Sequence, residues 1–134
     1  MIQPILWNQV LDVWEWAEPL ISRALNQTES GYSEEDVLTK LQAREMQLWV
    51  IPEKMACVTT IIVYPKFKVC LAAYLGGDDM DEWFPELVET LSTWASQNGC
   101  KYLEEWGRKG WEKVAAKQGF RTTFTVMRKP LDGR

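Results

Sequence analysis

The sequence predicts an α+β domain with a mixed, mostly antiparallel central sheet and helices on both faces. The hydrophobic period changes along the chain between helical and strand spacing, which indicates the order β, α, α, β, β, β, α, β, α, β. Two β-branched runs that end in proline are typical of antiparallel hairpins. A strand–turn–helix–strand unit over residues 67–106 then predicts one parallel pair, because a helix joins its two strands.

The first part of the chain is expected to form a short strand and two helices. Residues 1–5 are the strand, and Asn8 is expected to cap a helix that Pro19 kinks or divides. Ser33, with Asp36 three residues later, is typical of a capping box at the start of the second helix.

The middle of the chain is expected to form an antiparallel meander. The runs "MQLWVIPE" and "ACVTTIIVYP" predict two strands, with turns at residues 52–54 and 64–66. The third strand, "FKVCLAAYL", is apolar almost throughout, which indicates burial on both of its faces.

The last part of the chain begins with a glycine turn and a long helix. Apolar spacing predicts a helix from about 81 to 98, stopped by Gly99. A strand at 102–106, a short helix at 111–118 and a last alternating strand, "RTTFTVMRKPL", are expected to follow. We expect one domain over residues 1–134, with 131–134 as a tail.

Composition narrows the classes of function. The chain has 134 residues, of which 46% are hydrophobic, and no apolar run is long enough to span a membrane. Its N-terminus lacks the basic start of a secretory signal. A net charge of −4 disfavours binding to nucleic-acid phosphates.

The sequence has no histidine, so the commonest general base and metal ligand is missing. The cysteines Cys57, Cys70 and Cys100 are widely spaced and form no CxxC pair. They are interpreted as small buried residues of a protein in a reducing cytosol, and no metal site is predicted. Eight tryptophans are many for one small core, so we expect some of them at the surface.

The order of the expected strands and helices over nearly the whole chain resembles that of the GNAT (GCN5-related N-acetyltransferase) superfamily. The stretch "WEKVAAKQGF" resembles the family's late helix, which ends in Gly-Phe before the final strand. The pieces "MQLWV", "YPKFKVC", "LGGDDMDEW", "WASQNGC" and "GRKGW" resemble those of small acetyltransferase-like proteins of tailed phages. This resemblance implies the cytoplasm of an infected bacterium, or association with the virion.

The resemblance also implies a cofactor site. In the superfamily, acetyl-CoA lies between two strands that splay apart, which correspond to residues 67–75 and 102–106 here. The pyrophosphate rests on backbone N–H groups of the loop between strand and helix. The residues that match this site are Tyr74, Leu75, Gly76 and Gly77, with Arg108 as a further anion contact. Acetyl-CoA or another acyl-CoA is therefore the expected cofactor.

Acidic residues surround that loop at Asp78, Asp79, Asp81 and Glu82. The repulsion between a carboxylate and a phosphate roughly 4 Å apart is about 4 kcal/mol at an effective dielectric constant of about 20. A helix N-terminus stabilises a nearby anion by only about 0.3–1 kcal/mol. Repulsion therefore prevails unless these side chains point away. The favoured alternative is that Asp79 or Asp81 caps the helix and occupies the anion site itself.

The catalytic residues are the second question that the resemblance raises. Many members have an asparagine at the start of the late helix and, inside it, a tyrosine that acts as general acid toward the departing CoA thiolate. In this chain these two positions hold Arg108 and Ala115. Transfer to an amine also needs a base, for which Glu104 and Glu105 are the candidates. Successive strand residues face opposite sides, so at most one of the two looks into the cleft.

Three hypotheses follow. The first is an acyl-CoA-dependent N-acyltransferase that acts on an amine. The second is a non-enzymatic phage accessory or virion-associated protein that binds a protein partner, which predicts an exposed aromatic patch near Trp83, Trp106 and Trp111. The third is a binder of another small ligand, held by Arg108 and Lys109. The sequence predicts no oligomeric state.

Overall fold

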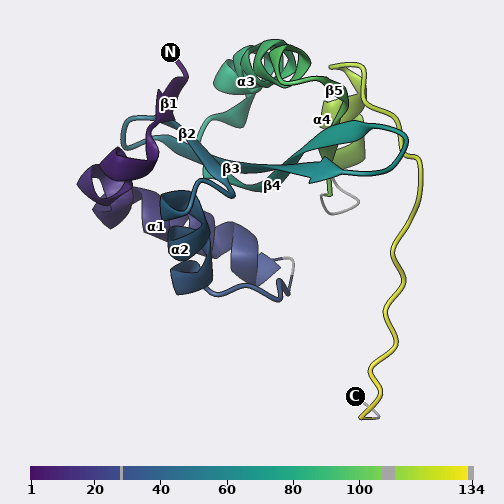
Figure 1. Cartoon of the computed structure of the whole chain (residues 1–134), viewed down its shortest axis with the longest axis horizontal. Helices are drawn as coiled ribbons and strands as arrows, with labels where there is room; N and C mark the ends of the chain where they lie inside the picture. The colour runs from purple at the N-terminus through teal and green to yellow at the C-terminus, as the bar shows by residue number, and fades with distance from the viewer. Residues whose placement is uncertain (28, 107–110, 133–134) are drawn as a thin grey trace.

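The structure is a computed structural model that describes residues 1–27, 29–106 and 111–132. Its centre is a five-stranded sheet in the order β1-β2-β3-β4-β5. The first four strands are antiparallel to their neighbours, and β5 runs parallel to β4 (Figure 1). The strands are β1 (Gln3–Ile5), β2 (Gln47–Ile51), β3 (Met55–Val63), β4 (Lys68–Gly77) and β5 (Cys100–Glu105).

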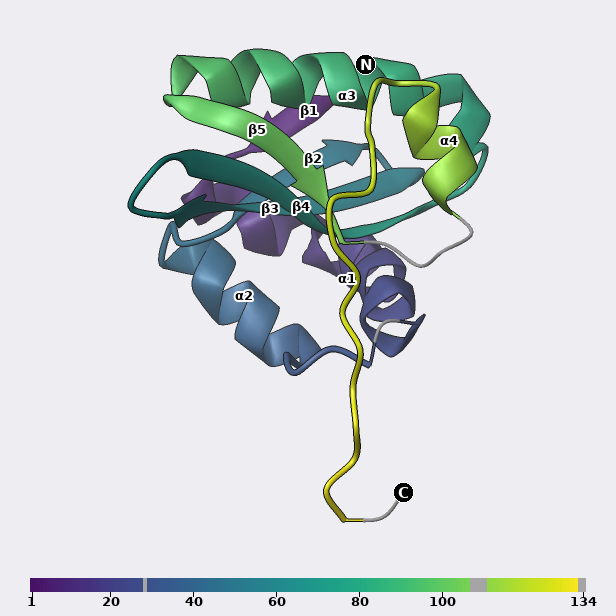
Figure 2. The same cartoon turned by 90° about the vertical axis from the view of Figure 1, so that its right-hand side faces the viewer.

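Helices cover both faces of this sheet, as the sequence predicts (Figures 1 and 2). Two helices, α1 and α2, lie on one face, and α3 lies on the other with the short helix α4 beside it. A single turn of 3₁₀ helix precedes α1. The helical elements are η1 (Trp7–Gln9), α1 (Val10–Gln27), α2 (Glu34–Gln42), α3 (Met80–Gln97) and α4 (Glu112–Ala116). The α+β class of the sequence analysis is thereby confirmed.

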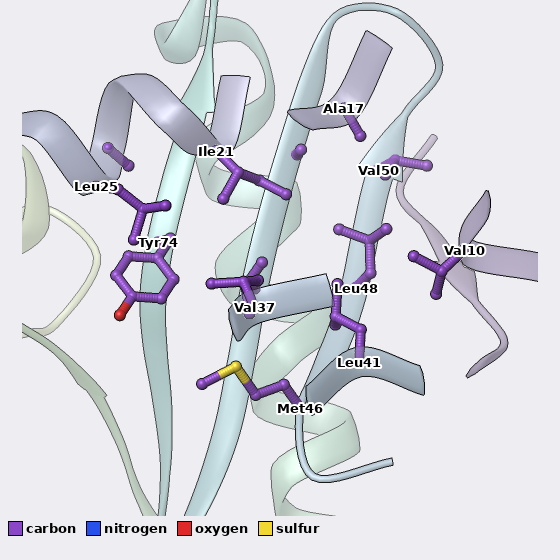
Figure 3. Packing of buried hydrophobic residues seen from close by; sticks show 13 residues of the cluster. Val10, Ala17, Ile21, Leu25, Val37, Leu41, Met46, Leu48, Val50 and Tyr74 are labelled. Carbon is purple, nitrogen blue, oxygen red and sulfur yellow. The ribbon is translucent and has the colours of Figure 1, made fainter. Parts of the chain in front are cut away.

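The first core fills the space between the sheet and the helices α1 and α2 (Figure 3). It is apolar except for one phenol, and the inner sides of both helices are fully buried, which is the main stabilising term for this face. Its labelled members are Val10, Ala17, Ile21, Leu25, Val37, Leu41, Met46, Leu48, Val50 and Tyr74.

The second core lies between the sheet and α3. Trp83, Phe84, Leu87 and Leu91 repeat at helical spacing on α3 and are buried against the sheet. Trp111 of the segment before α4 packs on Phe84, with ring centroids 5.9 Å apart. The late helix is therefore attached to α3 through aromatic contacts.

Several local predictions are confirmed. Ser33 Oγ accepts a hydrogen bond from the Asp36 N–H at 3.1 Å, and the Asp36 carboxylate accepts one from the Ser33 N–H at 2.8 Å. Both predicted hairpins are present, and Gly99 ends α3 with a φ of 78°. The helix α1 continues through Pro19 without a break, so the predicted division there is wrong.

The prediction of a last strand is wrong: the structure shows no strand there. Residues 121–130 belong to no helix or strand, and all of them are exposed. Alternating residues alone do not make a strand, since a strand also needs a neighbour for its N–H and C=O groups. The segment extends away from the body of the molecule in both views (Figures 1 and 2).

Candidate functional site

The sheet opens between β4 and β5. The two strands pair from Lys68 to Ala72, and the last partners are Ala72 and Glu105. Beyond Ala72, β4 continues to Gly77 with β3 as its strand partner. The register of β3 and β4 shifts between Val58 and Thr59, so Ala73 is the extra residue of a bulge. Backbone groups of β4 therefore lack a β5 partner beyond this bulge, at the place where the resemblance implies splayed strands.

The glycines at the end of β4 belong to the strand and not to a turn, which corrects the expected boundary. A Cβ atom on Gly76 would lie 2.1 Å from the backbone oxygen of Leu20 in α1. A Cβ atom on Gly77 would lie 2.7 Å from the Lys54 backbone oxygen and 3.1 Å from the Trp83 ring. Close packing therefore requires both glycines, whether or not a phosphate is bound nearby.

Three of the acidic side chains at the start of α3, those of Asp78, Asp79 and Glu82, are paired with cations. Lys54 Nζ lies 2.7 Å from Glu82 Oε2 and 3.9 Å from Asp79 Oδ2. Arg23 Nη1 lies 3.8 Å from Asp78 Oδ1. The hydrogen bond to Glu82 is the main cause that raises the pKa of Lys54. These ion pairs draw the carboxylates toward α1 and the β2–β3 turn, and they reduce the repulsion that an incoming phosphate would meet.

The helix start itself is not closed by a side chain. Asp79 occupies the N-cap position with a φ of 57°, and its carboxylate makes no capping hydrogen bond. The expectation that an aspartate fills the anion site is therefore wrong for Asp79. The Glu82 N–H donates to the Asp79 backbone oxygen at 2.9 Å, so an anion at the helix start would be met by the N–H groups that precede it.

The other two cofactor candidates on β4 point to opposite faces. Tyr74 is buried in the first core, and its hydroxyl lies 2.8 Å from Ser30 Oγ. Burial raises the pKa of this phenol. Leu75 packs against the second core, under α3. The four candidates Tyr74, Leu75, Gly76 and Gly77 thus share a stretch of backbone, and their side chains do not gather at one point.

The two candidate bases also face opposite sides, as the strand period predicts. Leu103 packs in the second core, so Glu105, two residues on, lies on the same α3 face. Glu104 lies on the other face and accepts a hydrogen bond from Trp106 Nε1 at 3.1 Å. Of the pair, Glu105 is therefore the one on the α3 side of the sheet opening.

Glu105 is unusual among the described carboxylates. Its Oε2 atom is buried and has no hydrogen-bond partner in the described part of the chain. Burial raises the pKa of this carboxyl group above its ordinary value of 4.5. A buried polar atom without a partner costs stability, and such groups are enriched at functional sites, so Glu105 is the first candidate at this end of the sheet.

The late helix has an alanine at the position where many family members carry the tyrosine acid. Ala115, at the position of the family tyrosine, is buried against the rest of the protein. Arg108 and Lys109 lie outside the described residues. The anion contacts that the sequence analysis assigned to them stay predictions.

The three cysteines are free, and two of them are disfavoured as nucleophiles by burial. Cys57 and Cys70 are buried, and burial raises the pKa of both thiols, to about 12 for Cys70. No group of three or more metal-ligating side chains occurs among residues 1–27, 29–106 and 111–132. In the same residues, no helix has the length and apolar character of a membrane span.

The three tryptophans predicted to form an exposed aromatic patch are not all at the surface. Trp83 is buried, and its Nε1 donates a hydrogen bond to the Asp78 backbone oxygen at 2.6 Å. Trp111 is half-buried against Phe84, and Trp106 is exposed. Trp83 is thus a support for the start of α3 and not a contact for partners.

The sequence analysis missed a groove at the opposite edge of the sheet. It has a volume of about 290 Å³ and is lined by residues of β1, β2 and the nearest ends of α1 and α2, together with Trp94 of α3, Trp7 and Arg44. The Arg44 guanidinium lies over the Trp7 ring, 4.4 Å from its centroid. No motif in the sequence marks this groove, because its residues come from distant segments.

Comparison with solved structures identifies the fold. No protein-family model matches the sequence, and no curated protein matches it. Solved structures do match over nearly the full length. The chain has the fold of the GCN5-related N-acetyltransferases.

One such structure is a GCN5-related N-acetyltransferase from Ralstonia eutropha, with a TM-score of 0.66, 16% identity and 99% of both chains covered. An aminoglycoside N-acetyltransferase in complex with CoA matches with a TM-score of 0.71 and 14% identity, over 97% of this chain and 93% of that one. An aminoglycoside acetyltransferase from an uncultured soil metagenomic sample, in complex with sisomicin, has a TM-score of 0.70 and 11% identity, over 98% and 95%. At these identities the similarity establishes the fold.

Proposed function

We propose that this chain is an acyl-CoA-dependent N-acyltransferase in which Glu105 is the general base. The observation that supports the proposal most directly is the position of Glu105. It is the last residue of β5 that pairs with β4, and its Oε2 is buried without a partner where the two strands part. In the same fold, a solved aminoglycoside N-acetyltransferase is in complex with CoA.

The opening between β4 and β5 is where we place the acyl chain. Bound acyl-CoA would supply an activated acyl group, whose C–S bond breaks as the C–N bond to the acceptor forms. Backbone N–H groups of β4 that face the opening beyond Ala72 are suited to hold the thioester carbonyl, because the pairing with β3 fixes this part of the strand. The start of α3, where the N-cap side chain makes no hydrogen bond, is suited to the pyrophosphate.

Glu105 suits the acceptor side of the reaction. An ammonium group cannot attack a thioester, so a base must take a proton from the acceptor amine. A carboxylate with a raised pKa takes that proton more readily than an ordinary glutamate at neutral pH. Ala115 cannot return a proton to the leaving thiolate, so we expect solvent to do so.

The acidic start of α3 predicts modest cofactor affinity. Arg23 and Lys54 neutralise part of the charge of Asp78, Asp79 and Glu82, but these pairs are exposed to solvent and therefore screened. We place the acceptor among amines. From the resemblance to phage proteins, we propose the cytoplasm of an infected bacterium as the site of action.

Calorimetric titration with acetyl-CoA, with free CoA alongside, tests the cofactor part of the proposal. We expect binding in the micromolar range, and tighter binding to the double variant Asp78→Asn/Asp79→Asn because two repulsive charges are removed. The matched control is Glu89→Gln, which removes a charge farther along α3. Absence of binding up to millimolar ligand would sink the acyltransferase hypothesis and favour the non-enzymatic binding protein.

Acyl transfer to a panel of amines, followed by release of free thiol, tests the base. Glu105→Gln is expected to lose about 10²- to 10⁴-fold in kcat while it keeps its affinity for acetyl-CoA. Glu104→Gln, one residue away on the opposite face, is the control and is expected to stay close to wild type. Equal activity in Glu105→Gln and wild type would contradict the assignment.

A further inference from the structure

The groove at the β1 edge of the sheet lies where β1 ends. The last residue of β1, Ile5, pairs with Leu48, whereas β2 begins one residue earlier, at Gln47. The space beside the start of β2 is therefore not filled by a strand. The groove volume of about 290 Å³ is close to the lower limit of about 300 Å³ for small-ligand pockets. This edge is opposite the β4–β5 opening, so what binds here does not depend on acyl transfer.

The walls of the groove are flat and apolar. Trp7 of η1 and Trp94 of α3 line it, and Trp49 meets Trp94 edge to face with ring centroids 5.3 Å apart. Leu6 and Trp7 are 59% and 44% exposed, so this apolar surface is open to water. Four buried side chains of the first core also line the groove (Figure 3): Val10, Leu41, Met46 and Leu48. Such walls favour a ligand with a flat apolar body.

The charge of the groove is positive. Among the described residues, Arg44 is the charged residue that lines it, and no aspartate or glutamate does. The neighbouring carboxylate of Glu45 lies 2.9 Å from Lys40 Nζ, and no described carboxylate lies within ion-pair distance of Arg44. The Arg44 guanidinium places its face over the Trp7 ring. Its N–H groups lie in the plane of the guanidinium and match the two oxygens of a carboxylate.

The backbone at Arg44 has a conformation that usually selects glycine. The Arg44 N–H donates to the Leu41 backbone oxygen at 3.2 Å, and the Glu45 N–H donates to that of Lys40 at 2.9 Å. This pair of bonds is the Schellman motif that ends a helix, and Arg44 occupies its left-handed position with a φ of 66°. An arginine is strained there, whereas a glycine is not. Strain of this kind is concentrated at ligand sites.

A polar relay adds a second donor to the lining. Trp49 Nε1 donates to Thr59 Oγ1 at 2.9 Å, and this hydroxyl donates to Gln47 Oε1 at 2.9 Å. The relay satisfies the Trp49 indole N–H, so Trp49 presents its ring to the groove. It also fixes the Gln47 amide by its oxygen. The amide nitrogen of Gln47 makes no hydrogen bond within the described part of the chain and can donate to a ligand oxygen.

We propose that this groove binds a small aromatic carboxylate, with the ring against the indoles and the carboxylate on the Arg44 guanidinium. An uncharged aromatic compound leaves the guanidinium without a counter-ion, and a small hydrophilic anion leaves the apolar walls in water. A flat body that carries one carboxylate satisfies both parts of the groove. The site is open on one side and shallow, so we expect modest affinity.

Two-dimensional NMR of the ¹⁵N-labelled full chain, titrated with 2-naphthoate and with the uncharged 2-naphthamide, is the test. We expect 2-naphthoate to shift the indole resonances of Trp7 and Trp94 with a dissociation constant of about 0.1–1 mM. The indoles of Trp106 and Trp111, near the other edge, are expected to stay in place. The amide has the same shape without the charge and is expected to bind roughly tenfold more weakly.

Arg44→Gly is the variant, because glycine suits the left-handed backbone and the chain is expected to stay folded. Its affinity for 2-naphthoate is expected to fall roughly tenfold, to that of 2-naphthamide. Lys66→Gln, in the exposed turn between β3 and β4, is the control for a lost positive charge and is expected to bind as wild type does. Circular dichroism checks that both variants are folded.

The comparison of the two naphthalene compounds on wild type needs no variant. Equal binding of both compounds would show that the charge plays no part and overturns the proposal. So does an absence of shifts up to about 5 mM 2-naphthoate, several times the highest dissociation constant expected. Shifts confined to Trp106 and Trp111, or unchanged affinity in folded Arg44→Gly, would place the ligand elsewhere and also overturn it.

Discussion

The start of α2 and the open end of the sheet use the same residue types in opposite ways. At the start of α2, Ser33 and Asp36 bond each other's backbone N–H groups. At the open end, Asp79 begins α3 without a capping bond, and Glu105 Oε2 is buried without a partner. Local polar groups cap the first region reciprocally, whereas the second has no side-chain cap and a buried carboxylate oxygen without a partner.

This difference separates structure from function in the molecule. Polar groups that are satisfied locally stabilise the fold and leave nothing for a ligand to bind. Donors and acceptors left unused in a packed protein cost stability, and such costs are concentrated at binding and catalytic sites. The open end of the sheet is therefore the better candidate for a site, and substitutions in the two regions are expected to differ in size and sign.

The largest expected difference comes from the glycines that precede the two regions. Gly76→Ala places a Cβ atom 2.1 Å from the Leu20 backbone oxygen, so α1 and β4 must move apart. We expect a loss of about 3 kcal/mol in the free energy of unfolding. Gly31→Ala, two residues before the α2 cap, meets nothing within 4 Å and is expected to change it by less than about 0.5 kcal/mol. Urea denaturation of both variants measures the difference, and equal losses would contradict the packing argument.

Much of the fold was predictable because its signals are local. The capping pair Ser33 and Asp36, the stripe of α3 and the stop at Gly99 each depend on neighbours in sequence, and all three are present. The opposite orientation of Glu104 and Glu105 also followed from the strand period alone.

The failures concern distant contacts. The close approach of Leu20 to Gly76 and the Arg23–Asp78 pair join segments that are far apart in sequence, so no local pattern reveals them. The glycines were interpreted as a phosphate loop for that reason. The last strand failed likewise, since alternation in residues 121–131 says nothing about whether a partner is at hand.

A smaller difference is expected at the two helix starts themselves. Ser33→Ala removes a capping acceptor from α2 and is expected to cost about 1 kcal/mol. Asp79→Asn keeps a residue that tolerates the left-handed conformation and removes no capping bond, so its cost is expected to be below about 0.5 kcal/mol. Thermal unfolding followed by circular dichroism gives both values. A larger loss for Asp79→Asn would show that its carboxylate does close the start of α3.

The subtlest difference is the sign of the pH dependence of stability in the two regions. Hydrogen bonds from Ser33, its backbone N–H first, lower the pKa of Asp36 below 3.8. Its contribution to stability is therefore present above about pH 3.8 and is lost as the pH falls through the lower, folded-state pKa. Burial raises the pKa of Glu105 above 4.5. The contribution of Glu105 to stability is therefore fully present below about pH 4.5. It is lost as the pH rises through the raised, folded-state pKa.

Two variants separate these signs in urea denaturation at a series of pH values. Asp36→Asn is expected to be less stable than wild type at neutral pH and to approach it in acid. Glu105→Gln is expected to be more stable at neutral pH, because a neutral amide is less costly to bury than a carboxylate, and to lose that advantage in acid. Glu104→Gln is the control for a change of net charge. A Glu105→Gln variant less stable than wild type at neutral pH would mean that the carboxylate has a stabilising partner, and the unused base at the end of β5 would then be a structural ion pair.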